Sequence, residues 1–571
     1  MDIDTRNKVI HSLPLCVEER KKDLLLEVNF QNRTHQSYDG IQNTYTTSSI
    51  SVTHIGNLII FNKPFSLATS ISHELLQLLE NNISVLARNI SGWGCLLINN
   101  KQNGQISLIT DRLGLLPIYY VKKSKGVYID WDEDYLSSHL GISELDKISI
   151  YEVLARGKVT PPHTLYQNMG VFPPSTIVTI NTENGKLTTE QYWSPNPNID
   201  HKKTSEQLAS DIVGSITASI NKITNKTEAS LEILLSGGLD SRMLLPTISK
   251  SGLKTTAYTI YSKKNKWSMR ELNVSKALAK HYGLEHISLE RTLQTLKESF
   301  QQSVNSCGGS KNVRHCYCGG FSEFSSYKPN QPFLMTGCYA DLLFKMDNPK
   351  KQEIRNLTPD LNWFCNVYEI KNKEISSEIE ERVEQFASLR NIIPSDLKTE
   401  EGRTYISLQR VLPIYNLRTL TFRRQLMSAR KLVFPLLDNE VLDVWQTIGD
   451  KRGKKIWLQA LEIMDPKLTS FVNSNTAIAP KTESKRMANL FLTKVKRKFS
   501  NISTKNSKKP ISSWDDSGNL IDFEKEFKLF LEKFDSLTNI MENIDISDKS
   551  DLHFWSRALT LQLWLHKIQS R

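Results

Sequence analysis

LEILLSGGLDS, residues 231–241, is the stretch of sequence that decides the fold. Its first five residues form a short, mostly apolar run that predicts a strand, and Ser236-Gly237-Gly238 breaks that strand. A helix is expected from about Asp240 until Pro246 kinks or shortens it. Two glycines allow the backbone to approach a polyanion closely, and successive N–H groups with the serine hydroxyls can cradle it. The stretch therefore predicts an anion-binding loop, although a plain strand–turn–helix connection with two turn glycines has the same outline.

Strands and helices alternate around this loop. A capping-box pattern at residues 204–207 opens a helix before it, with apolar residues following at helical spacing. After the loop, residues 255–261 predict a second strand, residues 268–271 a capping box that opens a second helix, and residues 286–289 a third strand. This order predicts a doubly wound α/β domain with a parallel sheet, whose ligands bind at the carboxyl ends of the strands. Beyond Ile379 the pattern is mostly helical.

The first two hundred residues show a different pattern of short β-branched runs separated by turn signals. Gly56-Asn57, Asn103-Gly104 and Asn184-Gly185 are such signals. The pattern stops at SPNPN, residues 194–198, a Pro/Asn-rich stretch typical of a linker. We therefore predict one domain over residues 1–195 and a second over residues 204–571.

Composition restricts the class of protein. The chain has 571 residues, 39% of them apolar and 23% charged, which excludes a wholly disordered chain and predicts roughly two to four domains. No apolar run approaches the ~20 residues of a membrane-spanning helix, and the N-terminal sequence lacks the apolar core of a signal peptide. Seven cysteines are an odd and sparse number, which disfavours a disulfide framework. These features predict a soluble, cytoplasmic protein.

The net charge is +12, and most of the excess lies in residues 481–509, where ten Lys or Arg accompany one acid, Glu483. A basic segment can bind nucleic acid or an acidic membrane surface. Only Phe491 and Phe499 interleave with the charges, which are few platforms for stacking bases. We therefore favour a solvated basic insertion over about residues 481–510, mobile and dispensable for binding at the loop, and expect no nucleic-acid partner.

SGGLDS, residues 236–241, resembles the pyrophosphate-binding loop of the asparagine synthetase family, whose members read SGG-x-D-S. Three further segments resemble that family in the same order. DRLGLLPIYY at 111–120 is similar to DR-x-G-x-x-P-L-Y-Y, TGCYAD at 336–341 to S-G-E-G-x-D, and FPLLD at 434–438 to V-P-F-L-D. The resemblance implies a class II amidotransferase-like α-β-β-α sandwich, followed by a doubly wound, parallel-sheet PP-loop ATP pyrophosphatase domain with a helical C-terminal part.

The resemblance also implies a reaction. In this family ATP adenylates a substrate carboxylate with release of pyrophosphate, and an amine or ammonia attacks the acyl-adenylate to form an amide. The residues at matching positions would bind pyrophosphate (Ser236, Gly237, Gly238 and Ser241), line the nucleoside pocket (Leu235, Ile260, Thr336 and Gly337), and hold Mg²⁺ as the catalytic carboxylates (Asp240 and Asp341). For Asp341 a helix-capping role fits nearly as well. The expected cofactors are ATP and Mg²⁺, the expected partner is a small-molecule or peptide carboxylate, and a homodimer is compatible with the resemblance.

The N-terminal domain departs from the family at its nucleophile. A working glutaminase domain of this family begins with Cys after Met removal, whereas position 2 here is Asp2. Cys16 is followed by Val-Glu-Glu instead of the family's C-G-I opening, and the first hundred residues lack the N-G-E glutamine-binding segment. We therefore expect a degenerate domain without glutaminase activity, as in the related β-lactam synthetases and lasso-peptide cyclases, which take the amine from the substrate.

The second domain departs from the family at a lysine. The family uses a Lys in a K-x-x-F-x-D-G-like stretch, but the corresponding residues 472–480, VNSNTAIAP, contain none. Lys454, Lys455 and Lys481 are the substitutes that the sequence offers, and Cys338 stands where the family has the glutamate of S-G-E-G-x-D. Adenylation is therefore better supported than amide formation.

Several functions stay open. The leading interpretation is an asparagine synthetase-like ligase, with asparagine biosynthesis as the family's own reaction. The alternatives are an intramolecular peptide or β-lactam-type cyclase, a tRNA-modifying enzyme supported only by the positive charge, and a catalytically silent nucleotide-binding protein. A substrate carboxylate could be held by three arginines that are equally typical of solvated helix charges, namely Arg423, Arg424 and Arg430.

Overall fold

The computed structural model describes the chain in pieces. The described residues are 15–20, 23–28, 42–60, 63–64, 73–123, 126–182, 186–225, 230–310, 312–315, 320–324, 332–340, 343, 368–389, 399–402, 404, 430–449, 453–475, 477, 479–480, 521–531, 537–545 and 552–569. The basic insertion predicted at 481–510 lies outside them, as do Asp341, Arg423, Arg424 and Lys481. Among the described residues, no helix is both long and apolar enough to cross a membrane.

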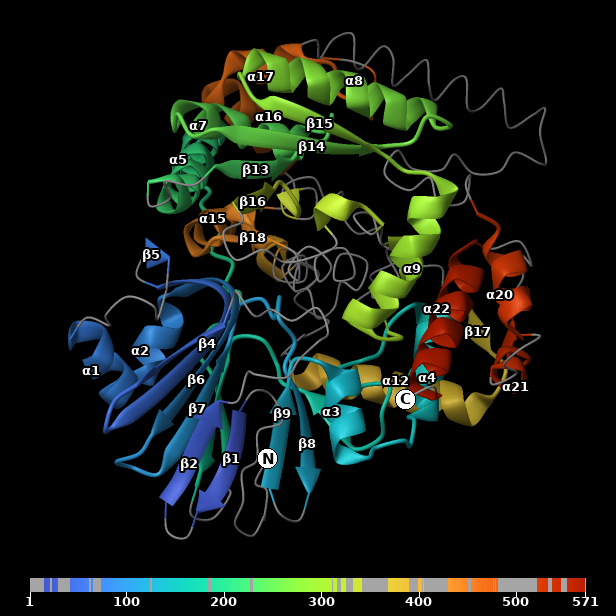
Figure 1. Cartoon of the computed structure of the whole chain (residues 1–571). Coiled ribbons are helices and arrows are strands. Elements are labelled where there is room, and N and C mark those ends of the chain that lie inside the picture. Colours follow the sequence, from blue (N-terminus) through green and yellow to red (C-terminus); the bar gives the residue numbers. More distant parts are fainter. Residues whose placement is uncertain are drawn as a thin grey trace.

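The N-terminal part is built on two larger antiparallel sheets between helices (Figure 1), and β1 and β2 pair as a separate two-stranded sheet. The larger sheet has the order β12-β11-β7-β6-β4-β3, with β5 paired to β4, and the smaller has the order β10-β8-β9. Helices α1 and α2 lie beside the larger sheet, and α3 and α4 lie on the far side of the smaller one (Figure 1), which is the predicted α-β-β-α arrangement. The elements are β1 (Leu15–Arg20), β2 (Asp23–Val28), β3 (Gln42–Thr46), β4 (Ile50–Ile60), β5 (Lys63–Pro64), α1 (His73–Asn81), α2 (Ile83–Arg88), β6 (Ile90–Asn100), β7 (Gln105–Thr110), β8 (Tyr119–Lys123), β9 (Gly126–Asp130), α3 (Glu133–Leu140), α4 (Lys147–Arg156), β10 (Met169–Val171), β11 (Thr176–Asn181) and β12 (Leu187–Gln191).

The turn predicted at Gly56-Asn57 is wrong. Strand β4 runs through both residues, and Gly56 pairs with Gly94 of β6. Both glycines have a positive φ, and a Cβ on Gly94 would lie 1.9 Å from the carbonyl oxygen of Ile55. The close approach of two strands therefore requires these glycines. The turn at Asn103-Gly104 is confirmed between β6 and β7, and Asn184-Gly185 lies outside the described residues.

The second part is built on a five-stranded parallel sheet of order β15-β14-β13-β16-β18, as the alternation of strands and helices predicts. Helix α8 packs on β14 and β15, and α5 packs against α7, α15 and α16 (Figure 1). The elements are α5 (Ser205–Thr224), β13 (Leu231–Leu234), α6 (Leu239–Arg242), α7 (Leu245–Lys250), β14 (Thr255–Tyr261), α8 (Lys266–His281), β15 (Glu285–Glu290), α9 (Leu293–Cys307), η1 (Val313–His315), η2 (Ser322–Phe324), β16 (Phe333–Thr336), β17 (Glu369–Ile370), α12 (Lys373–Leu389), β18 (Lys431–Val433), η4 (Pro435–Leu437), α15 (Asn439–Trp445), α16 (Gly453–Met464), α17 (Pro466–Ser470), α20 (Phe523–Leu531), α21 (Thr538–Met541), β19 (Ile544–Asp545) and α22 (Leu552–Gln569).

The sequence predicts the start of α5 correctly but not the start of α8. The capping box before α5 is confirmed, because Thr204 and Gln207 exchange side-chain-to-backbone hydrogen bonds of 2.9 and 3.2 Å. The capping box predicted at Ser268 is wrong, because α8 already begins at Lys266 with Asn265 as its cap. Ser268 Oγ instead accepts the N–H of Ser262 at 2.8 Å. Asn caps helices as well as Ser does, so the local sequence offers two caps and the loop geometry selects one.

The stretch predicted as a linker is held against the second part. The N–H of Asn196 donates to the side chain of Gln446 at 2.6 Å, and the N–H groups of Asn198 and Asp200 donate to the carbonyls of residues 446 and 447 at 3.1 and 3.0 Å. Nearby, Trp93 of β6 donates its indole N–H to the carbonyl of Leu432 at 2.6 Å. Because Leu432 lies in the edge strand β18, the N-terminal part covers an edge of the parallel sheet.

A buried ion pair lies at the same junction. Lys222 of α5 lies 2.7 Å from Asp438 and 3.0 Å from Glu440, and the Asp438 carboxylate also accepts the hydroxyl of Ser91 at 3.1 Å. The side chains of Lys222 and Asp438 are only 7% and 3% exposed. The last residue of the FPLLD segment thus joins the two parts of the chain.

Replacing Lys222 by Met should lower the free energy of unfolding by about 3 kcal/mol, because Asp438 would stay buried without its cation. Urea unfolding followed by far-UV circular dichroism measures the change. Lys203→Met is the matched control, because Lys203 forms an exposed pair with Asp211 and its loss should leave the unfolding midpoint nearly unchanged. Equal midpoints for Lys222→Met and the wild type would show that the junction does not depend on this pair.

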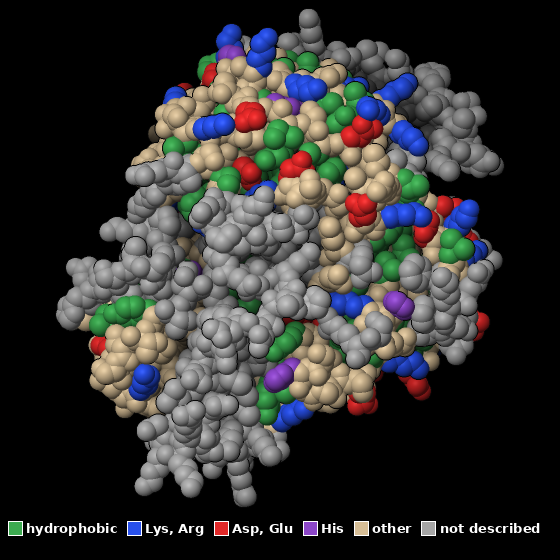
Figure 2. All heavy atoms as spheres, viewed as in Figure 1, with side chains coloured by type: hydrophobic (Ala, Val, Ile, Leu, Met, Phe, Trp, Pro, Cys, Tyr) green, Lys and Arg blue, Asp and Glu red, His purple; other side chains and the backbone are tan. Residues whose placement is uncertain are grey.

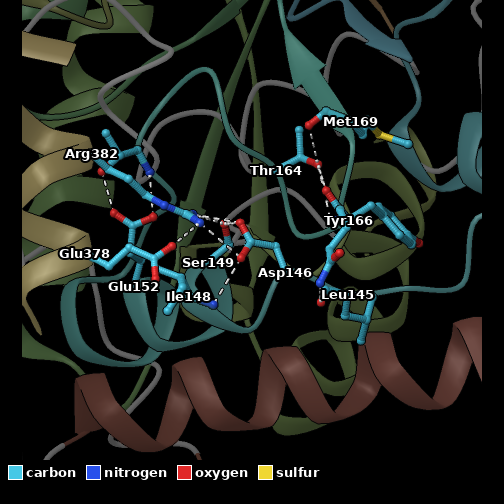
Figure 3. Close-up of polar contacts among 12 residues, drawn as sticks. Leu145, Asp146, Ile148, Ser149, Glu152, Thr164, Tyr166, Met169, Glu378 and Arg382 are labelled. Atoms are coloured by element: carbon cyan, nitrogen blue, oxygen red, sulfur yellow. Dashed lines mark hydrogen bonds and ion pairs between the residues drawn. The ribbon is translucent and has the colours of Figure 1, made fainter. Parts of the chain in front are cut away.

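The second part returns to the N-terminal part at α12 and α22. Arg382 of α12 contacts both carboxylate oxygens of Asp146, at 2.7 and 3.3 Å, and also Glu378 at 3.1 Å (Figure 3). Burial alone would favour the neutral acid, but the hydrogen bonds from Arg382 and Ser149 hold the pKa of Asp146 below its usual value. In α22, Trp564 and Lys567 both contact the carboxylate of Asp134, at 2.8 and 2.6 Å.

Figure 2 shows one face of the molecule. Over the upper part of this face, around α8, Lys and Arg side chains are interspersed with acidic ones (Figure 2). The described residues on this face therefore do not form a single basic patch of the kind that tracks a nucleic-acid backbone.

Candidate functional site

The predicted loop lies at the carboxyl end of β13, the central strand of the parallel sheet. The hydroxyl of Ser241 accepts the N–H of Ser236 at 3.0 Å, and the two serine hydroxyls share a hydrogen bond of 3.1 Å. The N–H of Gly238 points to the hydroxyl of Ser236 at 3.2 Å. These contacts close residues 236–241 into a compact ring that brings both hydroxyls and the glycine backbone to the end of the strand, where parallel sheets bind ligands.

A second loop packs against the first. Gly337 follows β16, the neighbour of β13, and a Cβ on it would lie 2.5 Å from the nitrogen of Ser241 and 2.7 Å from the carbonyl carbon of Asp240. Thr336 is buried, and its hydroxyl accepts the N–H of Cys338 at 3.3 Å. Tyr339 then adopts a φ of +82°, which is uncommon for a residue with a side chain and often marks a functional site. The structure thus brings the predicted residues of the two loops together.

The remaining predicted site residues lie at the same edge of the sheet, except one. Leu235 is buried and bonded to β14 through its N–H, which donates to the carbonyl of Tyr258 at 2.9 Å. Ile260 is half-buried near the end of β14, and Asp240 is half-buried in the single turn of α6. Asp341 lies outside the described residues.

A segment that follows α17 lies across the loop, and we call residues 471–475 the strap. The N–H of Ser474 donates to the carbonyl of Gly237 at 3.2 Å, and Arg270 of α8 donates to the carbonyl of Ser474 at 3.1 Å. A Cβ on Gly237 would lie 2.8 Å from the Cβ of Ser474. The strap contains part of the stretch where the resemblance places a lysine, and it presents Asn473, Ser474 and Asn475 instead. Of the substitute lysines, Lys455 is exposed on α16 and Lys481 lies outside the described residues.

The donor set fits a magnesium ion only in part. Magnesium in proteins is usually held by one or two carboxylates together with phosphate oxygens and water. Asp240 offers one carboxylate beside the loop, and no group of three His, Cys, Asp or Glu side chains with metal-site geometry occurs among the described residues. Asp240 is therefore a described carboxylate that could hold such an ion.

The N-terminal part has its own polar cluster at the DRLG segment. The carboxylate of Asp111 is buried and accepts four backbone N–H groups at 2.8–3.2 Å, those of Gly94, Leu113, Leu115 and Leu116. Burial raises the pKa of Asp111 to about 6, and the four hydrogen bonds oppose that rise. Burial and the Asp111 charge raise the pKa of the nearby Cys95 thiol. Cys95 is therefore held as a neutral thiol, which is a weak nucleophile.

Arg430 does not face the site. It lies next to β18, is 5% exposed, and contacts the carboxylate of Glu232 at 2.8 Å, while Tyr258 donates to the same carboxylate at 3.1 Å. Glu232 lies two residues before the end of β13, so this cluster is buried within the sheet. The prediction that Arg430 holds a substrate carboxylate is wrong, because its carboxylate partner is supplied by the chain itself.

The sequence does not predict that an arginine is buried beneath the loop. Arg242 directly follows Ser241, is fully buried, and donates to the carbonyls of Gly237 and Gly238 at 2.7 and 2.9 Å. An arginine after Asp-Ser at the start of a predicted helix looks like a surface charge, so no local signal separates it from one.

Comparisons with known proteins agree with part of this picture. Residues 67–193 match the glutamine amidotransferase domain family, a match that covers less than half of the chain and begins after Cys16. No curated protein matches the sequence. A glutamine phosphoribosylpyrophosphate amidotransferase from B. subtilis, solved with ADP and GMP, is similar at 11% identity and a TM-score of 0.18, over 47% of this chain and 50% of that chain. An NMN synthetase from Francisella tularensis is similar at 16% identity and a TM-score of 0.19, over 39% of this chain and 97% of that chain. This chain thus spans half the length of the amidotransferase, and residues 67–193 are similar to a glutamine amidotransferase domain.

Proposed function

We propose that the chain is an ATP-dependent ligase that forms an amide by adenylating a carboxylate. A carboxylate oxygen of the substrate attacks the α-phosphorus of ATP, the bond to the β-phosphate breaks, and pyrophosphate leaves. An amine or ammonia then attacks the acyl carbon, and AMP leaves with the electron pair of the broken C–O bond. The ring of residues 236–241 at the end of β13 is the observation that carries this proposal.

Each group of residues in the site has its own role in this proposal. The hydroxyls of Ser236 and Ser241 and the backbone of Gly237 and Gly238 hold the departing pyrophosphate, where fixed donors stabilise charge that develops in the transition state. Leu235, Ile260, Thr336 and Gly337 line the nucleoside side of the loop. Asp240, with Asp341, would hold Mg²⁺, which supplies positive charge to the leaving group.

ATP–pyrophosphate exchange tests the proposal. Wild-type protein is incubated with ATP, labelled pyrophosphate and a panel of carboxylates that includes aspartate, glutamate and short peptides. The proposal expects exchange that depends on one class of carboxylate, because adenylation is reversible before an amine arrives. Nucleotide binding without exchange for any acid would replace the proposal with a silent nucleotide-binding protein.

We also propose that the amine does not come from glutamine. Of the two cysteines in the N-terminal part, Cys95 is buried, and Cys16 lies within β1 opposite Glu27 of β2. A strand interior does not present the free α-amine that assists an N-terminal thiolate. The amine would then be part of the carboxylate substrate, as in a cyclase, or would be free ammonia.

Incubation with glutamine should release no glutamate above background, with a coupled glutamate dehydrogenase assay as the measurement. Cys16→Ala and Cys95→Ala are the matched variants, and neither should alter that background. Glutamate release that Cys16→Ala abolishes would establish Cys16 as a nucleophile and would overturn this part of the proposal.

A further inference from the structure

All three guanidinium nitrogens of Arg242 donate hydrogen bonds to main-chain carbonyls. Its Nε donates to Gly238 and its Nη2 to Gly237, both in the loop. Its Nη1 donates to Leu468 and Phe471 at 2.8 and 3.2 Å, and Nη2 donates also to Val472 at 3.0 Å. A guanidinium has five N–H donors, so each has a carbonyl acceptor. The side chain therefore ties the loop to the end of α17 and to the strap.

The two contacts in the loop set the direction of its peptide groups. A trans peptide is planar, and its N–H points opposite to its C=O. Because Arg242 holds the carbonyls of Gly237 and Gly238, the N–H groups of Gly238 and Leu239 point away from the guanidinium. The same contacts keep both carbonyl oxygens, which would repel an anion, on the buried side of the loop.

Within the described residues, the hydrogen-bond partners of Arg242 are all main-chain carbonyls and none is a carboxylate. Burial lowers the pKa of this guanidinium to about 10, with the charge of Asp240 acting in the opposite direction. Arg430, which is buried to a similar depth in the same sheet, has the carboxylate of Glu232 at 2.8 Å. The charge of Arg242 is therefore offset by five carbonyl contacts and the nearby charge of Asp240 instead of by a contacting carboxylate, and a bound polyphosphate would add negative charge on the other side of the loop.

We propose that Arg242 is a positioning residue for pyrophosphate: it turns the N–H of Leu239 toward the ligand side of the loop, holds the peptide whose Gly238 N–H donates to the Ser236 hydroxyl, fixes the strap over the loop, and supplies a buried positive charge behind both. The inference rests on the proposed function, since it assigns the polyphosphate of ATP to this loop. It adds a residue whose side chain does not itself contact the ligand.

Binding of inorganic pyrophosphate and of AMP, measured separately by isothermal titration calorimetry, tests the inference. Arg242→Lys keeps a positive charge but loses the planar fork, and Arg242→Met removes the charge. We expect pyrophosphate to bind about tenfold more weakly to Arg242→Lys and about a hundredfold more weakly to Arg242→Met, while the affinity for AMP stays within about threefold. Arg430→Lys is the matched control, and it should leave both affinities unchanged.

The outcomes separate the inference from the proposed function. Wild-type protein that binds no pyrophosphate would overturn the proposed function and the inference together. Wild-type binding with unchanged pyrophosphate affinity in Arg242→Lys would overturn the inference alone. An equal loss of pyrophosphate and AMP binding in Arg242→Lys would assign Arg242 a merely structural role. Should Arg242→Met fail to fold, Arg242→Lys decides among these outcomes.

Discussion

Asp240→Asn should slow ATP–pyrophosphate exchange by about a hundredfold or more. The substitution keeps the size of the side chain but removes the negative charge that would attract a magnesium ion to the loop. If the ion stabilises the leaving pyrophosphate by about 3 kcal/mol or more, the loss of that stabilisation accounts for the change in rate. Exchange is measured at saturating magnesium with the carboxylate that the wild type prefers.

The fold should hardly respond to the same change, because the N-cap of α6 is Gly238 and Asn has nearly the same size and shape as Asp. Asp522→Asn is the matched control, since Asp522 accepts the N–H of Lys525 before α20, far along the chain from the loop. Equal exchange rates for Asp240→Asn and the wild type would remove Asp240 from the mechanism and leave the metal to other residues.

Gly337→Ala should reduce the rate of ATP–pyrophosphate exchange to about 1% of the wild-type rate or less. The added methyl would lie 2.5 Å from the nitrogen and 2.6 Å from the Cα of Ser241, and backbone cannot move aside as a flexible side chain can. The second loop must then shift away from the first, and a misplacement of about 1 Å at a site of this kind costs about a hundredfold in rate. Overpacking should also lower the free energy of unfolding by about 1–3 kcal/mol.

Gly214→Ala separates local crowding from a general effect of losing a glycine. Gly214 lies within α5, and a Cβ there would have no heavy atom within 4 Å. Alanine in a helix interior is favoured over glycine, so this variant should be slightly more stable and equally active. Exchange by Gly337→Ala at the wild-type rate would show that the contact between the two loops is not needed for adenylation.

The sequence predicts well those helices and strands whose own residues carry the pattern of the element. Strand β13 is a mostly apolar run, β14 is rich in β-branched and aromatic residues, and β15 has apolar residues at alternate positions; the longest helix between them, α8, has apolar residues at helical spacing. Strand β16 is as short as β13 but is not followed by a Ser-Gly-Gly break, and β18 has only three residues, so the order of the sheet could not be completed from sequence. Gly56 misleads as a turn signal, because only its pairing with Gly94 of β6 explains it.

In the candidate site, too, the part formed by one continuous stretch of sequence is predictable and the part formed by distant residues is not. The loop at 236–241 is continuous in sequence, and its two serines and two glycines are sufficient to predict an anion site. The contribution of the strap is not predictable, since Arg242 and its acceptors Leu468, Phe471 and Val472 lie more than two hundred residues apart. Asp438 is similar: it belongs to a segment that suggests the synthetase site, yet its carboxylate contacts Lys222 and Ser91 at the junction of the two parts.

The place of α22 has a consequence for synthesis of the protein on the ribosome. Arg557 of this helix donates to the carbonyls of Leu154 and Ala155 in α4, and Trp564 and Lys567 reach Asp134 in α3. Once α3 and α4 have been synthesised, residues 157–551 are still to be translated, which takes roughly 20 to 80 s. During that time α22 cannot cover the surface of α3 and α4 that it contacts in the folded chain. Ribosomes that stall before residue 552 would release a chain whose amidotransferase-like part is made but still open on that side.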